Sequence, residues 1–191
     1  MRCPRLVPAL SVSTLVVSAA AFAADPDWHA ATAAHVRPLN AAAAAVLADA
    51  SPRSATIRRL MAQLDASDLI AYVQVTPFFN SATSDTRFLS AAGGRRYVVI
   101  TINTLNAASL RAAWLAHELQ HALEVANAPE VVSTATLEAL YRRIGRPVSD
   151  TGWETEEAIS TGHEAEAEYA ATPTVAKAHG AKQRGVVVGR G

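Results

Sequence analysis

The residues with the clearest chemistry are His117-Glu118-Leu119-Gln120-His121, which lie in a stretch with helical spacing of apolar residues. Four residues advance an α-helix by about 400°, so His117 and His121 project from one face only about 40° apart. Two imidazole nitrogens at this spacing can bind one metal ion. Glu118 lies about 100° further round the helix. Its carboxylate can therefore hold a metal-bound water molecule and accept its proton.

This pattern is unlikely to occur by chance. A random order of the chain's histidines and glutamates would produce it roughly 0.01 times per chain. The two middle positions, Leu119 and Gln120, are uncharged, and apolar neighbours such as Trp114 and Leu115 indicate a buried helix. The motif also follows directly on a predicted strand. We interpret it as a metal site rather than as two unrelated histidines.

The elements that must position this motif can be placed from periodicity and from turn residues. Asn106 is the predicted N-cap of the motif helix, which runs to about Ala126. Helical spacing predicts further helices over 28–50, 54–66, 133–144 and 151–171. Strand formers predict three strands over 69–75, 86–90 and 95–102, and Ala91-Ala92-Gly93-Gly94 marks a turn between the last two. Three strands in a meander are the simplest arrangement.

This order of elements predicts the fold class. Helices come first, a short and mainly antiparallel sheet follows, and the motif helix and two more helices complete the chain. A segregated order of this kind is typical of an α+β domain. The 191 residues suggest one domain.

Composition excludes several classes of function. The 17 basic and 17 acidic side chains balance, so no polybasic surface is available to bind nucleic acid. Charged residues make up 18% of the chain and aromatic residues are present, which disfavours wholesale disorder. We therefore expect a globular protein that does not bind DNA or RNA.

The first 24 residues have the order of a secretory signal peptide. Arg2 and Arg5 precede an apolar stretch, and Ala21-Phe22-Ala23 is a small-x-small cleavage pattern. We expect cleavage after Ala23 or Ala24, and a secreted or periplasmic protein with no stable membrane association. The alternative is an uncleaved membrane anchor, which Pro8 and several serines disfavour. Cleavage would remove Cys3, the only cysteine, so no disulfide or cysteine metal site is expected.

The motif at 117–121 and the strand before it resemble those of a zinc metalloprotease of the zincin type. In overall pattern the chain is also similar to bacterial exported proteins with a His-Glu-Leu-x-His-Ala helix. The resemblance covers residues 95–126 and continues less closely to Ala171. It implies a zincin-like domain over 25–174, and it implies Zn²⁺ as the cofactor. The last residues, 175–191, contain four glycines and no periodicity, so we expect a flexible tail there. The resemblance also implies that the strand 95–102 lies at the sheet edge and pairs with an extended peptide substrate.

A catalytic zinc site needs a third protein ligand. The metzincin subclass would have a histidine six residues after His121, where this chain has Asn127, so that subclass is excluded. The remaining common route is a glutamate from a later helix, as in gluzincins. In the predicted helix 151–171, Glu154 lies nearest to the centre of a stripe of small packing residues, and we predict it as the third ligand. Glu157 and Glu166 are the alternatives.

The predicted function is therefore that of a secreted zinc-dependent peptidase. His117, His121 and Glu154 would bind zinc, and Glu118 would be the general base that draws a proton from the zinc-bound water. The main alternative is a catalytically inactive zincin-like binding module. A third reading is an alanine-rich helical interaction protein with an accidental motif, in which His117 would point away from His121. Residues 28–50 could also form a pro-segment.

Overall fold

The computed structural model describes residues 34–77, 84–149 and 152–172. The predicted signal peptide over 1–24 and the predicted tail over 175–191 lie outside these residues. The elements follow in the order β1 (Val36–Pro38), α2 (Ala41–Ala50), a 3-10 helix η1 (Ser51–Arg53), α3 (Ala55–Asp65), β2 (Leu69–Thr76), β3 (Ser84–Ala92), β4 (Arg95–Asn103), α4 (Ala108–Ala126), α5 (Thr134–Ile144), β5 (Arg146–Pro147), β6 (Trp153–Glu154) and α6 (Glu156–Ala171).

The described chain combines helices with a small mixed sheet, which is compatible with the predicted α+β class. Most predicted elements are present, but the helix predicted over 28–50 is wrong in its described part. Residues 36–38 form β1, and α2 begins only at Ala41. Pro38 explains the difference, because a proline disfavours helical backbone at the preceding residue. Asn40 then caps α2, since its side chain accepts a hydrogen bond from the Ala43 amide at 2.8 Å.

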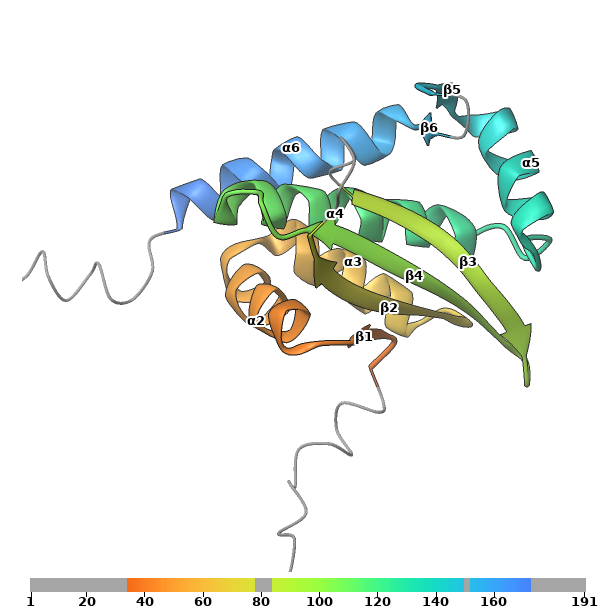
Figure 1. Ribbon diagram of the computed structural model, residues 1–191, viewed down its shortest axis with the longest axis horizontal. Helices are drawn as coiled ribbons and strands as arrows, with labels where there is room; N and C mark the ends of the chain where they lie inside the picture. Colours follow the sequence, from red (N-terminus) through yellow and green to blue (C-terminus); the bar gives the residue numbers. More distant parts are fainter. Residues whose placement is uncertain (1–33, 78–83, 150–151, 173–191) are drawn as a thin grey trace, which may run out of the picture.

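The predicted meander is also wrong. The strand order is β1-β2-β4-β3, and β2 runs parallel to both β1 and β4, so only β3–β4 is antiparallel in this sheet. The strand predicted at the edge, β4, is therefore central, and β3 forms the edge next to α4 (Figure 1). Burial explains this order, because Val98–Asn103 are all buried whereas most of β3 is partly or fully exposed. A strand that is apolar on both faces is most stable in the centre of a sheet.

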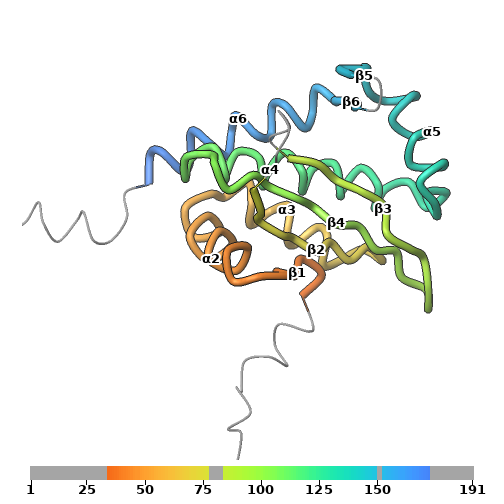
Figure 2. Tube along the Cα trace, viewed as in Figure 1, coloured from red at the N-terminus to blue at the C-terminus, as the bar shows by residue number. Residues whose placement is uncertain are grey.

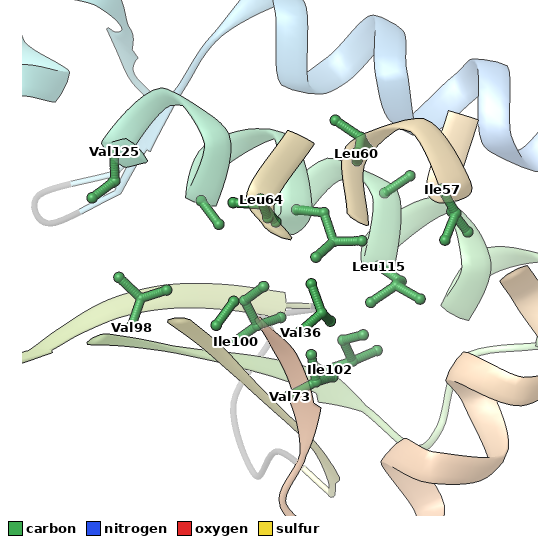
Figure 3. Close-up of a cluster of buried hydrophobic side chains, with 14 of the residues drawn as sticks. Val36, Ile57, Leu60, Leu64, Val73, Val98, Ile100, Ile102, Leu115 and Val125 are labelled. Atoms are coloured by element: carbon green, nitrogen blue, oxygen red, sulfur yellow. The ribbon is translucent and has the colours of Figure 1, made fainter. Parts of the chain in front are cut away.

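One face of the sheet packs on the helices and forms the core. The Cα trace shows α3 and α4 lying along this face, with α6 beside α4 (Figure 2). The side chains that meet between the sheet and these helices are aliphatic and fully or almost fully buried (Figure 3): Val36, Ile57, Leu60, Leu64, Val73, Val98, Ile100, Ile102, Leu115 and Val125. This burial holds α4 in a fixed position against the sheet.

The C-terminal end of α4 is held by a buried arginine of the central strand. Arg96 donates to the carbonyl oxygens of Val125 at 2.8 Å, Ala126 at 2.9 Å and Ala128 at 2.6 Å. Its guanidinium also forms a bidentate ion pair with Asp68, at 2.8 and 2.6 Å. The last carbonyls of a helix have no partner within the helix. Arg96 therefore adds a charged donor to the Val125 and Ala128 carbonyls, which also accept from the Ala128 and Val131 amides at 3.1 and 3.0 Å, and it caps the Ala126 carbonyl.

The N-terminal end of α4 differs from the prediction. The helix begins at Ala108 and Ala107 occupies the cap position without a side-chain hydrogen bond, so Asn106 is not the cap. Asn106 instead takes part in the turn after β4, where its amide donates to the Asn103 carbonyl at 3.4 Å. Among the described residues, no helix is both long enough and apolar enough to cross a membrane.

Replacing Arg96 by leucine should lower the free energy of unfolding by about 3 kcal/mol or more, because it removes the charged hydrogen bonds to three backbone carbonyls and the ion pair with Asp68. Urea unfolding followed by circular dichroism would measure this loss. Arg142→Leu is the matched control, since Arg142 is exposed and its partner is the exposed Glu138, and it should cost at most about 1 kcal/mol. Equal losses in the two variants would contradict the proposed role of Arg96.

Candidate metal centre

The helix α4 places both motif histidines on one buried face. His117 and His121 are 4% and 5% exposed, and their Nε2 atoms lie 3.1 Å apart. Their rings meet edge to face with centroids 4.7 Å apart. This convergence contradicts the reading of an accidental motif, which required His117 to point away from His121.

His117, His121 and Glu154 form one group of possible metal ligands, which we call the metal group. Its third member, Glu154, comes from outside α4. Glu154 Oε2 lies 2.9 Å from His117 Nε2 and 3.7 Å from His121 Nε2. The helix predicted over 151–171 begins only at Glu156, so Glu154 lies on β6, two residues before α6. Glu154 therefore lies beside both histidines, as predicted. The prediction that it lies on the last helix is wrong. Glu157 is exposed, and Glu166 is not part of the group.

His117, His121 and Glu154 could together hold a metal ion. Two ligands of a tetrahedral ion with bonds of about 2.0–2.1 Å are about 3.3 Å apart, and the three separations here lie between 2.9 and 3.7 Å. Glu154 Oε2 is buried and makes no well-formed hydrogen bond, despite its short distance to His117. A buried carboxylate oxygen without a hydrogen bond is costly. An ion between the three atoms would satisfy it.

Two close backbone approaches bring Glu154 to the histidines. A Cβ atom at Gly145 would lie 3.0 Å from the carbonyl oxygens of both Glu154 and Tyr141, so glycine lets the β5–β6 hairpin return against the end of α5. A Cβ atom at Gly162 would lie 3.3 Å from the Ala113 carbonyl oxygen, which is a tight contact, and 3.4 Å from His117 Cβ. Gly162 thus allows α6 to lie directly against α4 at the metal group.

Glu124 orients His121. Its Oε2 lies 2.8 Å from His121 Nδ1, and its Oε1 accepts a hydrogen bond from the Thr155 hydroxyl at 2.6 Å. A carboxylate on Nδ1 fixes the imidazole so that Nε2 faces the metal. Thr155 also caps α6, since its hydroxyl accepts from the Ala158 amide at 3.1 Å. One hydroxyl group therefore connects His121, through Glu124, to the element that carries Glu154.

Glu118 is not a member of the group formed by His117, His121 and Glu154, and it lies beside that group, as the helical phase predicted. It is only 3% exposed, and its Oε2 accepts a hydrogen bond from the Thr86 hydroxyl of β3 at 2.7 Å. In the part of the chain that the structure describes, Glu118 forms no ion pair. Sequence reasoning missed both Thr86 and Thr155, because their roles depend on tertiary packing. For Thr155, its position next to Glu154 was the one available signal.

The neighbouring charges shift the pKa values of His121 and Glu154. Burial opposes a charge on His121, but the hydrogen bond to Glu124 and the nearby carboxylates of Glu154 and Glu118 raise the pKa of His121 to about 10. Burial likewise opposes the charge on Glu154, but the two histidines lower its pKa to about 2. At neutral pH the metal-free site therefore holds a proton on His121 and none on Glu154.

From the sequence, four side chains are candidates for donating a hydrogen bond to a developing oxyanion, and the structure gives them different surroundings: Tyr97, Tyr141, Tyr169 and His163. Tyr169 donates to Asp49, and Tyr97 stacks on Tyr72 with centroids 6.3 Å apart. Tyr141 is buried against the His121 ring and donates to the His121 carbonyl at 3.2 Å. His163 is exposed and lines a cavity that His117 and Glu154 also line. Only His163 combines access to solvent with a place beside the metal group.

Comparison with protein-family models, with curated proteins and with solved structures found no match for this chain.

Because metal binding requires a free Nε2 lone pair, binding at pH 7 should release about one proton, which comes from His121. Between pH 6 and pH 8 the affinity should rise about tenfold per pH unit, since His121 must lose its proton and Glu154 has none to lose. Calorimetry of Zn²⁺ binding in two non-coordinating buffers of different ionisation enthalpy would count the protons. Release of none would contradict the charge state that we assign.

Glu124→Gln should weaken metal binding by about 10- to 100-fold, because glutamine cannot accept hydrogen bonds from His121 and Thr155 on two oxygens at once. Competition with a metal-binding dye would measure the affinity. Glu157→Gln, which changes an exposed residue of the same region, is the control and should leave the affinity unchanged. If both variants bind metal as tightly as the wild type, Glu124 does not orient His121.

Proposed function

We propose that this protein is a zinc-dependent hydrolase, and specifically a peptidase, with a small zincin-like fold. The observation that supports the proposal most strongly is the position of Glu118. It is a buried carboxylate beside a group of three metal ligands, but it is not one of them. Among the described residues its one hydrogen-bond partner is the Thr86 hydroxyl, and burying a carboxylate with so few partners is expensive for a residue with a purely structural role.

Zinc is the metal that the donor set favours. Two imidazole nitrogens and one carboxylate oxygen are typical ligands of catalytic zinc, which has three protein ligands and keeps its fourth position open. The site contains no cysteine, which structural zinc sites commonly use to close all four positions. Other divalent ions accept the same ligands, so the proposal concerns zinc as the preferred ion.

Glu118 is the general base of the proposed reaction. When zinc is bound, it supplies a Lewis acid that polarises the peptide carbonyl and makes water more acidic. Glu118 accepts a proton from the attacking water and passes it to the nitrogen of the leaving amine. Thr86 holds one oxygen of the Glu118 carboxylate, so the other oxygen can face the water. Glu124 keeps His121 Nε2 directed at the metal.

The edge strand β3 supports a peptide as the substrate. Thr86 of β3 contacts Glu118, so this edge lies beside the metal group. Among the described strands, β3 pairs with β4 alone. An extended peptide could add to its outer edge through backbone hydrogen bonds. This role belongs to β3 and not to the strand 95–102, which is central in the sheet.

The remaining expectations from the sequence enter the proposal unchanged. Residues 1–24 favour export to the periplasm or the medium. Glu154 follows His121 by 33 residues and comes from a later element, which favours a gluzincin-like site. Nucleic acid is not an expected ligand, because the chain is neutral overall. The rival function is a zincin-like binding module without activity.

Glu118→Gln should abolish or strongly reduce peptide hydrolysis, by roughly 10²- to 10⁴-fold, because glutamine cannot accept the proton. Zinc content should stay at the wild-type level, since Glu118 is not a ligand. Cleavage of a peptide library by the zinc-loaded protein, read by mass spectrometry, would measure the activity. Glu138→Gln, an exposed change, is the control.

Two outcomes would count against the proposal. If Glu118→Gln cleaves as fast as the wild type, the activity does not come from this site. If the zinc-loaded wild type cleaves no peptide in the library, the binding module becomes the better account.

A further inference from the structure

A cavity of about 180 Å³ opens between α4 and α6, directly beside the metal group. His117 and Glu154 both line it, so any molecule in the cavity lies next to the metal ligands. A cavity of 150 Å³ lined by apolar side chains can hold a benzene molecule. The volume here is therefore sufficient for one large side chain.

The walls of this cavity are mainly apolar. Trp114 and Leu110 of α4 face Ile159 of α6 across it. Trp114 also packs edge to face on the His117 ring, with centroids 5.3 Å apart, which fixes the indole beside the metal group. Such walls favour a side chain with an apolar stem.

Glu166 adds an unpaired negative charge to the same cavity. It is partly buried, and it forms no hydrogen bond or ion pair with any described residue. Its neighbours on α6 differ, because Glu164 pairs with Arg59 at 3.6 Å and Glu168 accepts from Ser54 at 2.6 Å. Lysine and arginine are absent from the cavity lining. Besides His117 and His163, the lining therefore offers no basic side chain to Glu166, and neither histidine pairs with it among the described residues.

We propose that this cavity receives a basic side chain, arginine or lysine, of the peptide that is cleaved. The aliphatic stem would lie against Leu110 and Ile159, and the cationic end would pair with Glu166. Arginine fits best, because its planar guanidinium can also stack on Trp114. This inference rests on the proposed peptidase function and gives it a substrate class, namely peptides with a basic residue beside the cleaved bond.

Peptides that differ at one position test the inference. Fluorogenic peptides would carry arginine, citrulline or leucine at each position flanking the bond that the wild type cleaves. Citrulline matters most, because it has nearly the shape of arginine without the charge. We expect kcat/KM for the best arginine peptide to exceed that of its citrulline counterpart about tenfold or more. Glu166→Gln should remove this preference, while Glu164→Gln on the same helix should leave it intact.

A binding measurement separates this inference from the proposed function. L-argininamide should quench the fluorescence of Trp114 in the zinc-loaded protein more strongly than L-citrullinamide does. The difference should vanish in Glu166→Gln, and Trp114→Phe should remove the signal. If argininamide binds in this way and no peptide is cleaved, the cavity assignment is supported and the peptidase function fails.

Two results would overturn the cavity assignment. One is cleavage that depends on Glu118 but proceeds equally fast with arginine and citrulline, which would leave the peptidase function standing. The other is an absence of cleavage together with equal binding of argininamide and citrullinamide.

Discussion

The close packing of α4 and α6 is the constraint on which the site depends. His117 and His121 are brought together by the helix itself, but a third ligand can reach them only if a later part of the chain lies directly against α4. Gly162 permits that approach, and Gly145 lets the hairpin before α6 carry Glu154 to the same point. Arg96 and the aliphatic core hold α4 on the sheet, so both sides of the site are fixed.

An excess of negative charge surrounds His117 and His121. Glu118, Glu124 and Glu154 all lie around the two histidines, and burial makes their mutual repulsion stronger than it would be in water. In the metal-free protein a proton on His121 offsets part of this charge, which is why its pKa rises to about 10. A divalent cation would offset more of it and would also satisfy the buried oxygen of Glu154.

The parts of the site that were predictable from the sequence are those set by local geometry. The helical repeat alone places His117 and His121 on one face and Glu118 beside them, and the structure has this arrangement. Glu154 was selected on the assumption that it lies on the last helix, whereas its position follows from the β5–β6 pairing and the cap at Thr155. Thr86 could not be found from the sequence, because its contact with Glu118 depends on β3 being the edge strand. Strand order of this kind depends on which strand is apolar on both faces, and hairpin signals alone suggested a meander.

The central claim is that His117, His121 and Glu154 bind one zinc ion, and native mass spectrometry of the purified protein after zinc incubation tests it most directly. The account predicts one zinc ion per wild-type chain, none in His121→Ala and a reduced occupancy in Glu154→Ala, with all three proteins folded by circular dichroism. Wild-type protein that is folded but binds no zinc would contradict the account. Full occupancy in Glu154→Ala would contradict the assignment of the third ligand.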